Sequence, residues 1–144
     1  MIDATSGILT LCETGFQITA NTTPQDMNKG IPTLIVRIEP SSTGYTHYDC
    51  WLDIEPQRYL WASVCFHGDA LESIRLFPQH QSTTLPAPRP NPMDTETSQL
   101  LGYAWYSKNF EQDELFFPHG SIRDVRGSDP IYYPTCVWIR YTRT

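Results

Sequence analysis

The strongest constraint on the fold is an alternation of polar and apolar side chains that runs from residue 47 to residue 55. A period of two is typical of a β-strand with one face in a core and the other face turned outward. One face is predicted to carry Tyr48, Cys50, Leu52 and Ile54, and the opposite face His47, Asp49, Trp51, Asp53 and Glu55. Pro56 and Gln57 end the alternation, so the chain is expected to turn there.

Further strands surround this one in the sequence. Stretches 59–67 and 71–77 follow after short turns, and the three together predict an antiparallel meander. Residues 135–141 alternate again, and shorter strand patterns cover 8–12, 16–18, 33–39 and 121–125. The central strands of the sheet are therefore expected at 46–54, 59–67, 71–77 and 135–141.

Two helices are expected beside these strands. A short one begins near Thr23 and Pro24, a typical cap and first position, and ends before Pro32. The main helix covers about 94–110, with Asp94 as its cap and apolar residues at helical spacing. Because strands come in runs rather than alternating with helices, the sequence predicts an α+β fold. We expect a mostly antiparallel sheet of about seven strands, with the main helix packed on one face.

Residues 78–93 differ in composition from the rest of the chain, with five prolines among sixteen residues. Proline lacks a backbone donor and favours extended, unpaired conformations. This stretch is interpreted as a surface connection within a single domain that spans 1–144. The alternative is a proline-rich ligand for another domain.

Composition excludes several classes of protein. With 40% hydrophobic and 18% charged residues, the chain is too apolar for intrinsic disorder. No apolar run reaches the length of about 20 residues that a membrane span requires, so no membrane association is expected. The net charge of −6 argues against nucleic acid as a partner. The first residues lack the features of a secretory signal, so the expected compartment is the cytoplasm.

No residue pattern indicates catalysis or metal binding. The four histidines show no metal-ligand spacing, and there is neither a nucleophile elbow nor a glycine-rich phosphate loop. The four cysteines contain no Cys-x-x-Cys pair and are interpreted as reduced, half-buried thiols. We therefore expect no catalytic residue, no metal and no cofactor, and hence a protein that is not an enzyme.

Two groups of acidic residues with neighbouring aromatic side chains are the candidate partner-binding residues. An aromatic ring supplies contact area, and acids steer and orient a basic partner. A position in the core is an equally open alternative for Trp51. For the acidic residues that follow the main helix, the alternative is a solvated loop. The first group is Asp49, Trp51, Asp53 and Glu55, and the second is Glu111, Asp113 and Glu114, beside Phe116 and Phe117.

Several short motifs, taken in order, resemble a group of small bacterial immunity proteins. The motifs are the hairpin, the Thr-x-x-Asp helix start, the Tyr-rich meander ending in residues 71–76, a helix with a Trp, Gly120-Ser121-Ile122-Arg123-Asp124 and Val137-Trp138-Ile139-Arg140-Tyr141. Proteins of this group are encoded beside secreted polymorphic toxins of the contact-dependent or type VI kind. They act by binding, so the resemblance implies no catalytic residues.

The resemblance implies an immunity protein that neutralises its cognate toxin by stoichiometric inhibition. The partner would be a toxin domain with a basic cleft, which an acidic aromatic surface could fill or flank. An adaptor or structural protein that uses the proline-rich segment or a sheet edge remains an alternative. A small-molecule-binding domain or an enzyme is a further alternative, although the sequence shows no convergence of polar groups for a pocket. The sequence makes no prediction of the oligomeric state.

Overall fold

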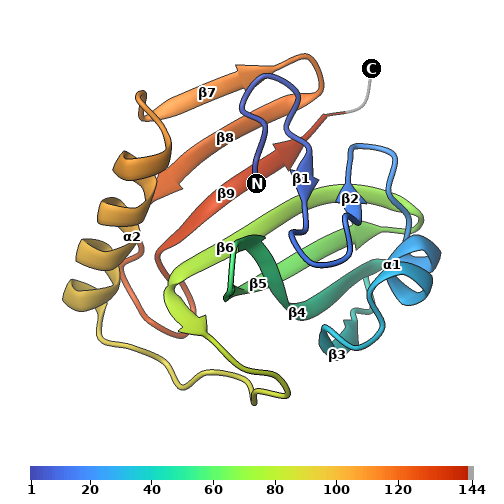
Figure 1. Ribbon diagram of the computed structural model, residues 1–144, viewed down its shortest axis with the longest axis horizontal. Coiled ribbons are helices and arrows are strands. Elements are labelled where there is room, and N and C mark those ends of the chain that lie inside the picture. Colours follow the sequence, from blue (N-terminus) through green and yellow to red (C-terminus); the bar gives the residue numbers. More distant parts are fainter. Residues whose placement is uncertain (143–144) are drawn as a thin grey trace.

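The structure, a computed structural model, describes residues 1–142. Two helices and nine strands follow one another in the order shown in Figure 1. They are β1 (Leu9–Thr10), β2 (Gln17–Ile18), α1 (Pro24–Gly30), β3 (Ile35–Pro40), β4 (Tyr45–Glu55), β5 (Arg58–His67), β6 (Ala70–Ser82), α2 (Thr95–Asn109), β7 (Glu114–Phe117), β8 (Gly120–Val125) and β9 (Cys136–Tyr141).

Seven of the strands form one antiparallel sheet in the order β3-β4-β5-β6-β9-β8-β7, and β1 and β2 form a separate small hairpin. The α+β fold predicted from the sequence is thus confirmed. The four stretches expected at the centre of the sheet are β4, β5, β6 and β9, which are neighbours in it. β7 was not predicted, because its four residues follow the acidic end of α2 without a clear alternation.

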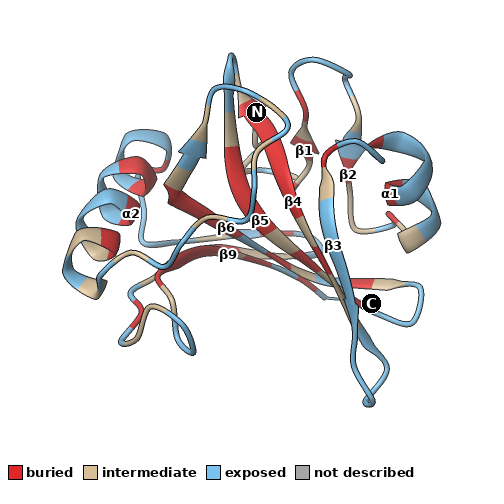
Figure 2. Ribbon diagram, turned by 90° about the horizontal axis from the view of Figure 1, so that it is seen from below, coloured by how far each residue is buried: buried red, intermediate tan, exposed pale blue. Residues whose placement is uncertain are grey.

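One face of the sheet, here called the inner face, carries the main hydrophobic core. The apolar residues that alternate along β4 and β5 lie here beneath the β1–β2 hairpin, α1 and α2. Trp105, Tyr106 and Phe110 from the end of α2 pack into the same core, which places the main helix on one face as expected. Figure 2 shows the result: β4 and β5 are buried along much of their length, while both helices turn exposed sides outward.

The ends of both helices follow from their local sequence. Thr23 and Asp26 form a reciprocal capping box at the start of α1, with Pro24 in the first turn. The Asp94 carboxylate accepts a hydrogen bond from the Thr97 amide at 2.9 Å and so caps α2. The predicted start of each helix therefore agrees with the structure.

The proline-rich segment begins inside β6 rather than after it. Ser82 and Gln81 still pair with β5, although the segment was expected to leave the sheet at residue 78. The register shifts between Phe77 and Gln81, so Pro78 lies in an irregular stretch of β6. No regular pairing occurs at this position, so the sheet tolerates a residue without an amide donor there. Only the residues after Ser82 form the irregular surface connection to α2.

No helix within residues 1–142 combines the length and the apolar character that crossing a membrane requires.

Candidate partner-binding surface

The face of the sheet opposite the helices, here called the outer face, carries two rows of mostly polar residues that cross all seven strands. Residues directly opposite one another on neighbouring strands share a face. The first row is Arg37, Asp49, Ser63, Arg75, Trp138, Arg123 and Glu114, and the second is Glu39, His47, Cys65, Ser73, Arg140, Ser121 and Phe116. β3 contributes the ion pair of Arg37 and Glu39, β4 contributes Asp49, and β7 contributes Glu114. The strands β6, β9 and β8 between them contribute Arg75, Arg140 and Arg123.

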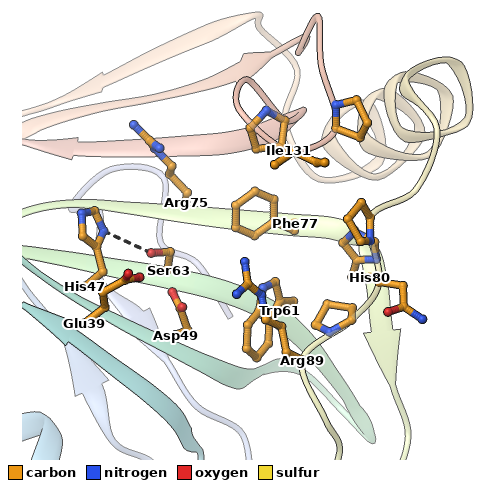
Figure 3. Close-up of a pocket in the computed structure, with 15 residues that line it drawn as sticks. Glu39, His47, Asp49, Trp61, Ser63, Arg75, Phe77, His80, Arg89 and Ile131 are labelled. Atoms are coloured by element: carbon orange, nitrogen blue, oxygen red, sulfur yellow. Dashed lines mark hydrogen bonds between the residues drawn. The ribbon is translucent and has the colours of Figure 1, made fainter.

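An open groove of about 480 Å³ lies on this outer face. Its floor is the outward side of β4, β5 and β6, including Asp49 and Trp61. One wall is the proline-rich segment around Arg89, and the other is the loop before β9, which contributes Ile131. In Figure 3, Ile131 and Arg89 lie on either side of Phe77 and Trp61.

The loop that forms the second wall presents three large apolar side chains to solvent. Ile131, Tyr132 and Tyr133, here called the ridge, are 66%, 80% and 71% exposed. Ile131 lines the groove, whereas both tyrosines line a second hollow of about 360 Å³ that also contains Trp138. The ridge therefore stands between two hollows, and a partner seated on this face would contact it from both sides.

Hydrogen bonds hold the ridge in one conformation. The Asp129 carboxylate accepts from the amides of Ile131 and Tyr132, both at 2.9 Å, and these bonds hold the pKa of Asp129 below its usual value. The backbones of Asp129 and Tyr133 bond to each other in both directions at 3.2 Å. Exposed aromatic side chains on a preorganised loop lose little conformational entropy on binding.

A glycine fixes the base of the same loop. A Cβ at Gly127 would lie 2.1 Å from the Tyr133 carbonyl oxygen, so only glycine allows this close approach. The Gly127 amide donates to the buried Thr135 hydroxyl at 2.9 Å, and its carbonyl accepts from the Gln99 side chain of α2 at 2.7 Å. The loop is thereby tied both to the sheet and to the helix.

Of the four β4 residues proposed as partner-binding, Asp49 is the one that lies on the floor of the groove. Trp51 is 3% exposed and packs against Trp61 at a ring-centroid distance of 5.0 Å. Its indole nitrogen donates to the Ala87 carbonyl of the proline-rich segment at 3.1 Å. Of the two alternatives for Trp51, the structure favours the core, with the proline-rich segment as its cover in place of the main helix.

Asp53 and Glu55 are both engaged within the chain. Asp53 is 4% exposed, so the expectation of an accessible carboxylate at this position is wrong. The register shifts between Leu52 and Glu55, and the Asp53 carboxylate accepts instead from the Glu13 amide at 2.9 Å. The Glu55 carboxylate accepts from the indole nitrogen of Trp105, which ties the end of β4 to α2.

We expect Asp53→Ala to lower the free energy of unfolding by ~1–3 kcal/mol, because it removes the buried carboxylate that accepts the hydrogen bond of the Glu13 amide. Asp49→Ala is the matched control on the same strand and should leave stability within about 0.5 kcal/mol of the parent. Urea unfolding followed by tryptophan fluorescence measures both. Equal stability of the two variants would show that Asp53 does not anchor the turn at residue 13.

Glu111 and Asp113 are exposed between the end of α2 and β7, and Glu114 is the exposed first residue of β7, at the opposite edge of the sheet from β3. The structure does not bring them together with Asp49, since β5, β6, β9 and β8 lie between. Of the adjacent aromatic pair, Phe117 is 7% exposed and belongs to the core, whereas Phe116 is 75% exposed. The second acidic group therefore forms a separate patch.

His47 contacts two potential nucleophiles at the edge of the groove. Its ring nitrogens lie 3.4 Å from the Ser63 hydroxyl, as Figure 3 shows, and 3.9 Å from the Cys65 sulfur. Burial raises the pKa of the Cys65 thiol, whereas a nucleophilic cysteine requires a lowered pKa. The contact therefore does not form an activated thiol.

The remaining thiols also lack the environment of a reactive or ligating group. All four cysteines are free, and burial raises the pKa of Cys136 to about 11 and that of Cys50 further. Cys12 is exposed, in contrast to the half-buried thiols expected from the sequence. Within the described part of the chain, no three His, Cys, Asp or Glu side chains are grouped so that they could hold a metal ion.

Sequence reasoning missed the ridge and the arginines of the outer face. Ile131 to Tyr133 lie between Pro130 and Pro134, outside the stretches predicted as strands. Three consecutive large apolar residues outside any alternating pattern were the available signal. Arg75, Arg123 and Arg140 lie on three different strands, so their proximity depends on the strand order β6-β9-β8.

Comparison with known proteins gives a match of structure. No protein-family model and no curated protein sequence matches the chain. The fold is similar to a chain of the solved complex of Rhs1-CT with its cognate immunity protein RhsI1, with a TM-score of 0.53 and 16% identity. The match covers 97% of this chain and 85% of the other. The resemblance to immunity proteins is thus confirmed at the level of the fold.

Proposed function

We propose that this protein is an immunity protein, which binds a cognate toxin domain and neutralises it by stoichiometric inhibition without catalysis. The observation that carries the proposal is the ridge, a rigid and exposed group of apolar side chains between two hollows. Exposed aromatic side chains next to pockets are typical of the residues that dominate protein–protein binding energy. The shared fold with a chain of a toxin–immunity complex supports the same function.

The interface in this proposal is the outer face, with the ridge at its centre and the groove beside it. Asp49 and Glu39 supply negative charge at the β4 side of the groove. A basic cleft of the toxin would meet this side, and the exposed acids Glu111, Asp113 and Glu114 would flank it at the far edge. Complementary charge raises the association rate, which favours capture of the toxin before it acts.

We further propose that the protein acts in the cytoplasm.

The proposed interface lies on the outer face because the inner face is occupied by the chain's own helices and hairpin, so the outer face is the larger accessible part of the sheet. Trp51 and Asp53 are left out of the proposed interface because both are buried.

The test is neutralisation of the toxin domain encoded by the reading frame adjacent to this protein's gene. Co-expression should restore growth that the toxin domain alone arrests. In a titration with purified components, toxin activity should fall linearly and disappear at one equivalent. Arrested growth despite soluble expression of both proteins would refute the proposal, and inactivation far below one equivalent would show catalysis.

A further inference from the structure

Three arginines surround one tryptophan on the outer face. The guanidinium carbons of Arg75, Arg123 and Arg140 lie 5.9, 5.1 and 4.8 Å from the ring centroid of Trp138. They come from β6, β8 and β9, and the paired registers of these strands place all of them on one face. We call these four residues the arginine cluster.

None of the three arginines forms a salt bridge within residues 1–142, although Glu114 faces Arg123 across the β7–β8 ladder. The ion pair found within these residues joins Arg37 to Glu39 on β3, outside the cluster. All three arginines are exposed, so their heads remain available from solvent. Arg75 and Arg123 both face Trp138 across the ladder, and Arg140 faces Ser73 and Ser121. The cation–π contacts with Trp138 are worth only about 0.5–1 kcal/mol each at exposed sites.

Every polar group that the cluster offers is a hydrogen-bond donor. Guanidinium groups carry five N–H donors and no acceptor. The indole nitrogen of Trp138 is buried and has no hydrogen-bond partner, which is costly for a donor removed from water. Trp138 and Arg75 also line the hollow beside the ridge. A ligand for this site must therefore supply several acceptors, and negative charge would make it fit best.

We infer that the arginine cluster binds an acidic segment of the partner protein through side-chain carboxylates. This inference rests on the proposed function and names the chemistry of the partner at that interface. Arginine recognises carboxylates through two parallel N–H···O bonds, and the three exposed guanidinium groups supply such donors. The two tyrosines of the ridge border the same hollow, so the segment would pack against them.

A carboxylate-bearing protein segment fits better than a nucleic acid because acidic residues flank the positive area. Glu114 lies beside Arg123 on β7, and Asp49 lies two strands from Arg75 on β4. These acids would repel an extended polyanion on both sides of the cluster. A short acidic segment can lie between them. The outer face then presents a positive centre between two acidic flanks, which restricts how the partner can be seated on it.

The first test uses a hexaglutamate peptide and does not need the toxin. In a titration followed by NMR, the peptide should shift the Trp138 indole and arginine side-chain signals of the parent. It should not do so in the Arg75→Ala/Arg123→Ala/Arg140→Ala variant, and hexaglutamine should shift neither. An unchanged parent spectrum, or equal shifts in the variant, would overturn the inference. Tighter binding of a ten-residue oligothymidylate would overturn it in favour of a nucleic-acid site.

The second test measures binding of the adjacent toxin domain. The triple variant should bind at least tenfold more weakly than the parent, while Arg58→Ala, an exposed arginine outside the cluster, should bind equally well. Equal affinity of parent and triple variant would refute the inference and leave the proposed function intact. No binding by the parent would refute the proposed function, and the peptide titration would then decide the inference alone. If the triple variant does not fold, Arg123→Ala replaces it.

Discussion

Trp51→Ala is expected to lower the free energy of unfolding by ~3–5 kcal/mol, the usual range for deleting a buried tryptophan. The ring is 3% exposed and packs on Trp61, and its N–H holds Ala87 of the proline-rich segment. Its loss would leave a cavity and release this segment from the sheet. Urea unfolding measures the change, and a shift of that size would make the variant marginal at physiological temperature.

Two controls separate packing from hydrogen bonding in this result. Trp51→Phe keeps most of the ring and should lose only about 1 kcal/mol, from the bond to the Ala87 carbonyl. Tyr132→Ala removes an aromatic side chain that is 80% exposed, and should leave stability nearly unchanged. A stable Trp51→Ala variant that no longer bound the toxin would instead make Trp51 a partner contact.

The double variant Tyr132→Ala/Tyr133→Ala is expected to weaken binding of the toxin domain by about 2–4 kcal/mol, which corresponds to roughly 30-fold to 700-fold in affinity. The two rings supply exposed contact area on a loop that Asp129 already holds in place. Because the loop is preorganised, the loss should appear mainly as faster dissociation. Surface-based kinetics with the adjacent toxin domain measures both rates.

A matched pair of exposed residues elsewhere controls for simple loss of apolar surface. Leu100 and Leu101 on α2 are 66% and 43% exposed and line neither the groove nor the second hollow. Replacing both by alanine should leave the affinity unchanged. If the α2 variant lost as much affinity as the ridge variant, the toxin would contact the helical side of the molecule, and the outer-face interface would be wrong.

The strands and the helices were predictable because they depend on local patterns. The alternation around Tyr48 to Ile54 and the cap at Asp94 are properties of neighbouring residues, and the structure contains both elements. The face on which each β4 side chain lies was also predictable up to Leu52, since a regular strand keeps its period of two. At Asp53 the register shift ends this regularity, and no pattern in the neighbouring residues predicts the shift.

The exposure of the outer face could not be predicted because distant segments cover part of it. Trp51 lies on the polar face of β4, as expected, but residues 85–87 of the proline-rich segment bury it. Asp49 lies two residues away on the same strand and stays in the open groove. The arginine cluster likewise depends on the order of β6, β9 and β8 in the sheet, which cannot be predicted from local sequence patterns. Long-range packing, rather than local propensity, therefore decides which candidate residues are available to a partner.

Hydrogen exchange of the protein with and without the adjacent toxin domain tests the proposed interface most directly. The strand amides are already bonded within the sheet, so the informative amides lie in the two walls of the groove, at residues 88–93 and 128–134. Complex formation should slow exchange in both walls, and the Tyr132→Ala/Tyr133→Ala variant should reduce this protection. Protection confined to α1 and the β1–β2 hairpin, with unchanged exchange in both walls, would contradict binding through the outer face.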